Sequence, residues 1–368
     1  MPIKVWDYLE EYAAEKDEIR QAIDEVLNSG WLILGEKVSS FEKAYSAFCG
    51  TTYGVGVDNG TNALFLALKA LGIGPGDEVI TVSNTAVPTV SAIASTGARA
   101  VFVDVDEVTA LMDTAQLQAK VTQNTKAILP VHLYGQCVDM DAVAAVAQQH
   151  GLSVVEDCAQ SHGAQYKGRM AGSMSDLSAT SFYPTKILGT FGDGGMINTS
   201  SEQHYKKLQR LRFYGMEKTY YAVEHGYNSR LDEVHAAILL KKLAHLNEYV
   251  ARRRALAARY NRLLANCGLR LPVERADGKH AYYLYVVRHP QRDRILAACK
   301  DREVLLNVSY PWPIHTMSGY AHLGYKAGDL PVTEQLASQI FSLPMYPSLS
   351  EQQQSQVVEC LLEVIRKL

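Results

Sequence analysis

Short apolar runs alternate with helical repeats along most of the chain. The apolar runs that predict strands lie at residues 55–57, 79–82, 100–105, 127–131, 154–156, 179–183 and 196–198. Helical patterns lie between several of them, at residues 61–71, 87–95, 114–121 and 140–149. Most of these strands are apolar throughout, which is typical of strands covered on both faces. We therefore expect an α/β fold with a mostly parallel central sheet and helices on both faces.

The two ends of the chain predict further helices and a second domain. Helices are expected at residues 7–29, 40–48 and 231–265 and from Glu351, and shorter strands at 282–287 and 304–308. A chain of 368 residues is too long for one ordinary core. We expect a large domain at residues 1–245, which includes the N-terminal helical segment, and a smaller C-terminal α+β domain at residues 246–368. The long helix at 231–265 is expected to join them.

The composition predicts a globular protein without a strongly charged partner. Hydrophobic residues make up 47% of the chain, enough for a sizeable core, and the net charge is −3. Because there is no long basic run, nucleic acid is not expected as a partner. No uncharged apolar run reaches membrane-spanning length, and residues 1–20 have no apolar signal core. The six cysteines form no CxxC pair and are interpreted as reduced thiols of a cytoplasmic protein.

Two segments resemble anion sites but are interpreted otherwise. Residues 72–77 (GIGPGD) are rich in glycine, yet a strand and not a helix follows them, so we interpret them as a turn. The basic run Arg252-Arg253-Arg254 lies within the predicted long helix. Such a run is more often a solvated helix face than an anion site, and we interpret it as one.

Lys186 follows an apolar, aromatic strand candidate and a proline turn. Taken alone, it would be a surface cation, but Phe182, Tyr183 and Leu188 flank it. A partly desolvated lysine amine can act as a nucleophile and a proton shuttle. Glycines at 189, 192, 194 and 195 let the backbone pack close to whatever the amine holds. We therefore expect Lys186 to be catalytic.

Asp157 ends the apolar strand at 154–156, about 30 residues upstream of the lysine. It could be a helix cap or half of a surface salt bridge, but ligands of open α/β sheets bind beyond the carboxyl ends of the strands. A lysine at one strand end and an aspartate at another are what pyridoxal phosphate (PLP) requires. The amine bonds to the aldehyde, and the carboxylate keeps the pyridine nitrogen protonated. We expect PLP as the cofactor and no metal site.

Other polar residues are candidates for the same pocket. The segment Asn59-Gly60-Thr61-Asn62 opens a helix, and its exposed N–H groups would suit a phosphate, although Asn59 or Thr61 would serve equally as a plain N-cap. Ser181 is either a further phosphate contact or an ordinary strand serine. Gln160 is placed to reach the phenolic oxygen of the cofactor. His132 and Gln136 end another strand, although a lone histidine is more often structural.

Eight motifs in order resemble the fold-type-I PLP-dependent sugar aminotransferases of the DegT/StrS group. They are 30–35 (GWLILG), 59–64 (NGTNAL), 132–136 (HLYGQ), 156–164 (EDCAQSHGA), 181–186 (SFYPTK) with 192–195 (GDGG), 226–231 (GYNSRL), 310–315 (YPWPIH) and 343–347 (LPMYP). Each motif is weak alone, but the resemblance covers nearly the whole chain.

The resemblance implies a role for each matching residue. Lys186 would hold the cofactor, Asp157 would pair with the ring nitrogen and Gln160 would contact the ring oxygen. Cofactor contacts are further implied at Gly60, Thr61, Asn62, Ala86, Ser181 and Asn228. The sugar pocket is implied to include Trp31, Tyr183, Tyr310 and His315. In this group, the residue at Asn228 reaches the phosphate of the neighbouring subunit, which implies a homodimer with shared active sites.

Two departures from the family pattern are visible. Many members carry an aromatic residue that stacks on the cofactor ring where this chain has Ala86, so the stacking group is absent or supplied elsewhere, for example by His132. Leu231 stands where the family often has Met, a mild change. Relatives with histidine at the position of Lys186 are dehydratases, a reading that the lysine disfavours.

The resemblance also suggests the reaction. Tyr183-Pro184 before the lysine is similar to members that act on 3-keto sugars. We therefore expect an aminotransferase that moves an amino group from glutamate to a nucleotide-linked keto sugar, namely a dTDP-linked 3-keto-6-deoxyhexose. A 4-keto-sugar or UDP-sugar aminotransferase is the alternative within the class. A non-catalytic regulator or binding protein with the PLP fold is the alternative from another class.

Overall fold

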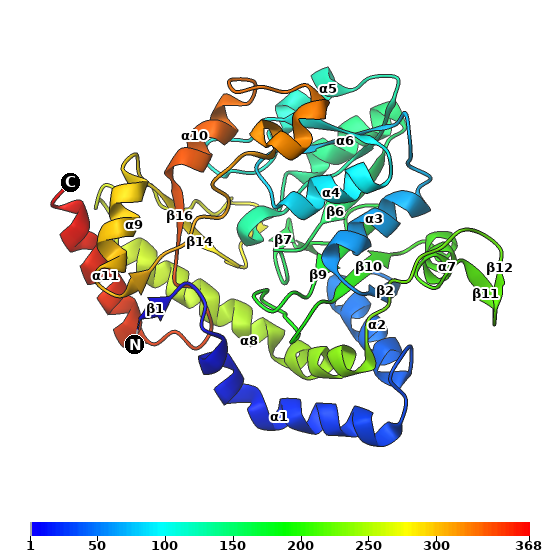
Figure 1. Cartoon of the computed structure of the whole chain (residues 1–368). Helices are drawn as coiled ribbons and strands as arrows, with labels where there is room; N and C mark the ends of the chain where they lie inside the picture. The colour runs from blue at the N-terminus through cyan, green and yellow to red at the C-terminus, as the bar shows by residue number, and fades with distance from the viewer. Residues whose placement is uncertain (1) are drawn as a thin grey trace.

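The computed structural model describes residues 2–368, and within them the chain centres on a seven-stranded sheet (Figure 1). In spatial order, the strands are β2 (Tyr53–Val57), β10 (Gly195–Thr199), β9 (Leu177–Ser181), β6 (Ser153–Asp157), β5 (Thr125–Ile128), β3 (Glu78–Val82) and β4 (Arg99–Val103). β10 is antiparallel to β2 and β9, whereas the other pairings are parallel. The predicted α/β class and mostly parallel sheet are confirmed.

Helices cover the sheet and explain the continuous apolar runs. Those that pack on it include α2 (Glu36–Cys49) against β2, α3 (Gly60–Ala70) against β9 and β10, α4 (Val87–Ser95) against β4, and α6 (Met140–His150) against β5 and β6. Every residue of β3 and of β10 is buried. A strand buried on both faces has no polar alternation, which is why these strands could be found as apolar runs.

The helix expected at 114–121 forms only as two short pieces. A 3₁₀ turn, η1 (Thr114–Gln116), leads into the single helical turn α5 (Leu117–Lys120). Leu117 is the only buried side chain in the two pieces. Tertiary packing supplies most of the stability of a short helix, so one buried residue supports little more than a turn here.

The long helix α8 (Glu233–Leu263) connects two hydrophobic cores, and α1 (Tyr8–Ser29) packs along it. Val250 belongs to the core that contains the large sheet, whereas Leu256 belongs to the second core. The second core is built from β1 (Ile3–Lys4), β14 (Tyr285–Arg288), α9 (Arg292–Lys300), β15 (Val304–Leu305), β16 (Ile340–Leu343) and α11 (Glu351–Ile365). The two cores are not strictly sequential, because Ile3 packs in the second and Leu336 in the first. A domain division at 245/246 stays a prediction.

The apolar patterns of the sequence did not predict several short helices and strands. They are α7 (Glu202–Leu211), α9, α10 (Pro331–Gln339), β7 (Gln165–Tyr166), β8 (Arg169–Met170), β11 (Met216–Lys218), β12 (Tyr221–Ala222), β13 (Gly278–Lys279), β16, and the 3₁₀ turns η2 (Leu133–Gly135), η3 (Ile314–Thr316) and η4 (Ser318–Leu323). α7 buries only Leu208 and Leu211 and is otherwise mostly polar, so it offers few apolar positions to mark a helix. The shortest strands are too brief to establish any period.

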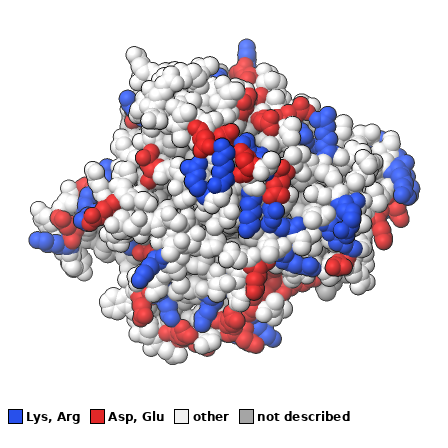
Figure 2. Space-filling model, turned by 180° about the vertical axis from the view of Figure 1, so that it is seen from behind, with Lys and Arg blue, Asp and Glu red and all other residues white. Residues whose placement is uncertain are grey.

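The surface carries mixed charge. On the face seen in Figure 2, basic and acidic side chains lie interspersed, as the small net charge of the chain would suggest. Among the described residues, no helix has the combination of length and apolar character that crossing a bilayer requires.

The arginine run on α8 corrects the sequence interpretation of a solvated face. Arg253 is only 2% exposed, and its Nη1 donates to the carbonyl oxygens of Met345 (2.6 Å), Tyr283 (3.2 Å) and Tyr282 (3.4 Å). Arg252 and Arg254 are both half-buried and also hydrogen-bonded. A guanidinium has five donors in a fixed fork, and Arg253 uses it to join α8 to two loops that converge on it. The local sequence could not show that these loops return to the helix.

We predict that Arg253→Met lowers the free energy of unfolding by about 2–4 kcal/mol, because it leaves buried carbonyl groups without their donor. Urea unfolding of the purified chain measures the change. Arg262→Met is the matched control on the same helix, where the side chain is exposed, and it should change stability by no more than about 0.5 kcal/mol. Equal effects of the two substitutions would contradict the joining role of Arg253.

Candidate active site

The carboxyl ends of β5, β6 and β9 open onto a cavity of about 340 Å³ that contains most of the predicted site. The predicted site residues that line it are Gly60, Thr61, Ala86, Asp157, Gln160, Ser181, Tyr183 and Lys186. Lys186 and Asp157 come from different strand ends and meet at this one cavity. This is the arrangement that parallel strands make, because their carboxyl ends lie at the same edge of the sheet.

Asp157 is the buried acid of the cavity. Its side chain belongs to a residue only 4% exposed, and its two oxygens accept hydrogen bonds from Thr89 Oγ1 (2.8 Å) and the Ala159 N–H (3.1 Å). Burial raises the pKa of this carboxyl, and the two hydrogen bonds and the nearby charge of Lys186 offset only part of the effect. The site therefore holds a carboxylate whose charge is incompletely stabilised by the protein itself.

Lys186 sits in a tight turn after β9. Its backbone N–H donates to the Tyr183 carbonyl at 2.9 Å, and a Cβ at Gly189 would lie 2.6 Å from the Pro184 oxygen, so only glycine allows the turn to close there. The side chain is half-buried, and its Nζ lies 4.6 Å from the centroid of the Tyr283 ring. No ion pair to Nζ is found among residues 2–368. The amine is therefore accessible to a ligand in the cavity.

The N-terminus of α3 is capped by Asn59 and still leaves N–H donors at the cavity. Asn59 caps the helix, because its side chain accepts from the Asn62 N–H (2.8 Å) and its carbonyl from the Ala63 N–H (3.0 Å). The N–H groups of Gly60 and Thr61 have no acceptor among the described residues, and both residues line the cavity. Two unpartnered donors at a helix N-terminus form an anion site.

Gly60 is needed for this anion site to form. A Cβ at position 60 would lie 2.6 Å from Cβ of Ser181, so a larger residue would push α3 away from β9. The close approach places the Ser181 hydroxyl at the same end of the cavity as the free N–H groups. Asn62 lies outside the cavity, because its side chain turns back to donate to both carboxylate oxygens of Asp58, at 2.8 and 3.0 Å.

The rest of the cavity lining includes a polar side chain, Gln160, and several apolar ones. Gln160 accepts from the Tyr134 N–H and donates to the hydroxyl of Tyr310, both at 2.9 Å. Val131 and Ala159 supply apolar surface beside Ala86. Tyr183 is the only aromatic residue among the described residues that line the cavity, so no ring takes the stacking position where Ala86 stands.

Besides Asn62, four predicted residues do not line this cavity. One of them, Tyr310, is hydrogen-bonded to the lining residue Gln160. Asn228 and Trp31 are exposed, Trp31 by 63%, and neither lines the cavity of its own chain. His315 is only 1% exposed, and both of its ring nitrogens are engaged, Nδ1 with Ser83 Oγ at 2.8 Å and Nε2 with Glu334 Oε1 at 3.0 Å. It has no free polar atom for a sugar, and its contacts are those of a residue that secures the loop after β3.

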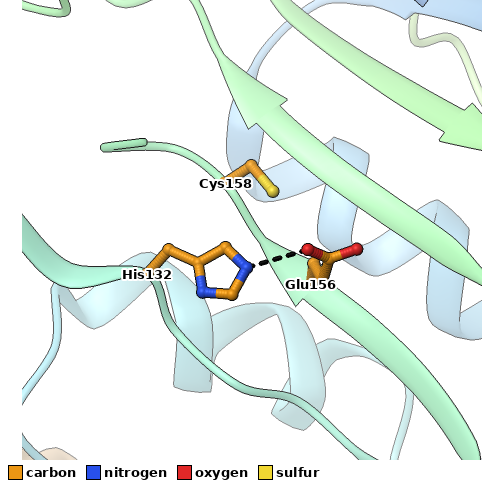
Figure 3. A group of neighbouring side chains, drawn as sticks. All are labelled: His132, Glu156 and Cys158. Carbon is orange, nitrogen blue, oxygen red and sulfur yellow. Dashed lines mark hydrogen bonds and ion pairs between the residues drawn. The ribbon is translucent and has the colours of Figure 1, made fainter. Parts of the chain in front are cut away.

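His132 has a structural role, which corrects the idea that it stacks in the pocket. It is fully buried, and its Nδ1 accepts from the Val138 N–H at 3.2 Å, so Nε2 carries the proton and donates to Glu156 at 2.8 Å (Figure 3). Cys158 lies near enough to complete a group that could hold a metal ion, but the histidine lone pair is already used. Gln136 is likewise buried, with hydrogen bonds to the Val273 and Arg275 backbone.

The His132–Glu156 pair lies directly behind Asp157. Glu156 also accepts from the Gly172 and Met174 N–H groups and from Ser175, so its lone pairs are fully engaged. Burial acts to raise the pKa of Glu156, but these hydrogen bonds outweigh it and leave the pKa lowered. The backbone N–H of His132 donates to the carbonyl of Asp157 at 3.1 Å. The His132–Glu156 pair thus fixes the carboxyl ends of β5 and β6, where Asp157 stands.

Sequence reasoning missed two residues of the site. Thr89 holds Asp157 from the first turn of α4, and Tyr283 faces the amine from the segment before β14. No motif or apolar pattern in the sequence marks either residue as part of a site. They become identifiable only when the fold brings α4 and the segment before β14 to the site.

We predict that Asp157→Asn makes the cofactor-free chain at least as stable as the wild type at pH 7, because it removes a buried charge and keeps a polar group for Thr89. Folding raises the pKa of Asp157 above its ordinary value near 3.8. The wild type therefore has the full contribution of this carboxyl to stability below pH 3.8, where the group is protonated in both the folded and the unfolded state. It loses that contribution as the pH rises through the pKa of the folded state. The advantage of the variant should therefore disappear on acidification. Thermal unfolding over a pH series measures it.

Asp24→Asn, at an exposed position of α1, is the control for the general effect of removing one negative charge. It should show no such pH-dependent advantage. An Asp157→Asn chain clearly less stable than the wild type at neutral pH would contradict the view that burial disfavours this carboxylate.

Comparisons with known proteins identify the family of the chain. The model of the DegT/DnrJ/EryC1/StrS aminotransferase family matches residues 13–362. A protein of Micromonospora megalomicea subsp. nigra named dTDP-3-amino-3,4,6-trideoxy-alpha-D-glucose transaminase is 55% identical over 100% of both chains. A protein of Geobacillus stearothermophilus named pleiotropic regulatory protein is 45% identical over 100% of this chain and 99% of its own.

The similarity extends to solved structures. DesV of S. venezuelae, solved in complex with a ketimine intermediate, superposes with a TM-score of 0.98 and 41% identity, over 100% of this chain and 99% of that chain. The family match, the relatives and the cavity that unites Lys186 with Asp157 lead to one conclusion: the chain belongs to the DegT/DnrJ/EryC1/StrS aminotransferase family.

Proposed function

We propose that this protein is a PLP-dependent aminotransferase that moves an amino group from glutamate to the 3-keto carbon of a dTDP-linked 6-deoxyhexose. One observation carries the proposal: Lys186 and Asp157 line one cavity beside the unpartnered N–H groups of Gly60 and Thr61. The family match and the identity to the Micromonospora transaminase support the reaction class and the 3-position.

The cavity offers a matching group to each chemical feature of PLP. The Gly60 and Thr61 N–H groups, with Ser181, suit a phosphate at a helix N-terminus. The incompletely stabilised carboxylate of Asp157 suits a protonated ring nitrogen, because a cation there restores its charge balance. The amine of Lys186 suits the aldehyde.

The chemistry divides between the cofactor and a few side chains. Bound PLP supplies an electron sink that stabilises negative charge on the carbon next to the reacting nitrogen. Nζ of Lys186 would hold the cofactor at rest, and when free it would remove a proton from one carbon and deliver it to another. Asp157 keeps the ring nitrogen protonated, and the apolar surface of Val131 and Ala159 limits access of water. The reverse sequence aminates the keto sugar.

The substrate assignment is the finer part of the proposal. Tyr183-Pro184 precedes Lys186 as in members that act on 3-keto sugars, and Tyr183 lines the cavity and is half-exposed. Tyr310 is tied to the cavity through Gln160. The name of the Geobacillus relative raises regulation as another function, but the presence of Lys186 and Asp157 in the lining of one cavity supports turnover.

We further propose a homodimer with shared active sites. Asn228, which the family pattern assigns to the phosphate of the neighbouring subunit, is exposed and does not line the cavity of its own chain. The β11–β12 hairpin nearby projects from the body of the molecule (Figure 1). It carries Tyr220 and Tyr221, exposed by 94% and 64%. Large exposed aromatic side chains on a projecting hairpin are typical of an interface between subunits.

The free cysteines support a further proposal, a cytoplasmic location. All six are unpaired, and five of them are buried. Unpaired thiols in a chain of this size are typical of a reducing compartment.

We predict that the PLP-loaded protein, given glutamate and a panel of nucleotide-linked keto sugars, aminates a dTDP-linked 3-keto-6-deoxyhexose at C3. NMR of the product locates the new nitrogen. Amination at C4, or preference for a UDP-linked sugar, would identify one of the alternative substrates. Absence of amination with every sugar and donor would favour a regulator.

Lys186→Ala is the control for chemistry at the proposed site. It removes the only described amine that lines the cavity, so it should abolish both the visible absorption of lysine-bound PLP and transamination. Lys241→Ala, on α8 and away from the cavity, should keep both. Normal turnover by Lys186→Ala would contradict the assignment.

We predict complementation between two inactive variants if active sites are shared. Asn228→Asp places negative charge where the phosphate of the partner is expected, and Lys186→Ala removes the amine. After unfolding and refolding together, the mixture should recover about a quarter of the wild-type rate, since half of randomly formed dimers are mixed and each has one intact site. A mixture as inactive as its components would place both residues in the site of one chain.

A further inference from the structure

The ring of Tyr283 faces the amine of Lys186. Nζ lies 4.6 Å from the ring centroid, within the range of a cation–π contact. Tyr283 is 9% exposed, and its hydroxyl lies 3.1 Å from Oγ1 of Thr185, the residue directly before the lysine. The ring therefore contacts the catalytic turn at two adjacent positions.

The backbone of Tyr283 is held firmly. Nη1 of the buried Arg253 donates to its carbonyl and to those of Tyr282 and Met345. On the other side, Gly135 packs against the same segment: a Cβ there would lie 2.9 Å from the nitrogens of both Tyr282 and Tyr283. Since the backbone of Tyr283 is held by these contacts and its hydroxyl by Thr185, the more mobile member of the pair is the flexible lysine side chain.

Lys186 has a second direction in which to turn. It also lines a neighbouring cavity of about 220 Å³, whose wall includes the carboxylates of Glu11 and Glu15 and the ammonium of Lys242. A carboxylate would attract a charged Lys186 amine and draw it away from the cofactor cavity. An aromatic face also attracts the charged amine but offers no strong acceptor, so the amine can leave again at low cost.

We propose that Tyr283 is a positioning residue whose ring holds the Lys186 amine beside the cofactor cavity whenever that amine is not bonded to the cofactor. The proposal rests on the function proposed above, in which Lys186 is displaced and must remain near to carry a proton between two carbons. The ring keeps the amine from turning towards Glu11 and Glu15 during that interval. Tyr283 itself touches neither of the two carbons.

The test compares Tyr283→Phe, which keeps the ring, with Tyr283→Leu, which removes it. Crystal structures of the cofactor-free full-length chain should show Nζ over the ring in the wild type and in the Phe variant, and turned towards Glu11 or Glu15 in the Leu variant. In the loaded enzyme, the Leu variant should lose about 2- to 30-fold in kcat, the range of one cation–π contact, with little change in KM. The Phe variant should keep most of the wild-type kcat.

Several outcomes would overturn the proposal. They are a wild-type crystal structure with Nζ away from the ring, a Leu variant with unchanged kcat, and a Phe variant as impaired as the Leu variant, which would assign the effect to the hydroxyl. The wild-type structure decides the question even if the Leu variant does not fold. Failure of the wild type to aminate any keto sugar would instead refute the proposed function, and the crystallographic result is independent of that outcome.

Discussion

The buried carboxylate of Asp157 is the constraint on which the rest of the site depends. Removal from water disfavours its charge, and the hydrogen bonds from Thr89 and Ala159 compensate only in part. A positive charge that enters from the cavity is what would complete the compensation. The burial of this charge lowers the stability of the folded chain. A protonated ring would remove that cost, so in the proposed function cofactor binding would stabilise the fold.

That carboxylate can be presented accurately because it stands on a sheet. The Asp157 N–H donates to the Pro130 carbonyl, and its own carbonyl accepts from His132, so both backbone groups are fixed by the strand beside it. Glu156 and His132 anchor the same strand end from within the core. The flexible partner is Lys186, whose long side chain would, in the proposed function, both bond to the cofactor and leave it. The site thus combines a rigid acid with a mobile amine.

The sequence predicted those features of the fold and site that depend on residues close together in the chain. Buried strands appear as apolar runs, and Lys186, Asp157 and Gly60 stand at strand ends or a helix start, where the pattern itself marks them. Arg253 was misread because its acceptors are carbonyls of loops distant in the sequence. Thr89 was missed for the same reason, because its partner Asp157 is distant in the sequence. His132 was assigned to the pocket because the residues around it in the sequence do not indicate its hydrogen bond to Glu156. Properties that arise only when separate segments meet cannot be deduced from one segment.

The continuity of α8 limits how this molecule can move. One uninterrupted helix of 31 residues passes through both cores, so rotation of one core against the other would have to bend the helix or break its packing. A hinge of the kind that closes two lobes around a ligand has no flexible joint along α8. A bulky sugar nucleotide must then enter, and its product leave, through small adjustments of surface loops and side chains. The two cores themselves act as a nearly rigid frame around that route.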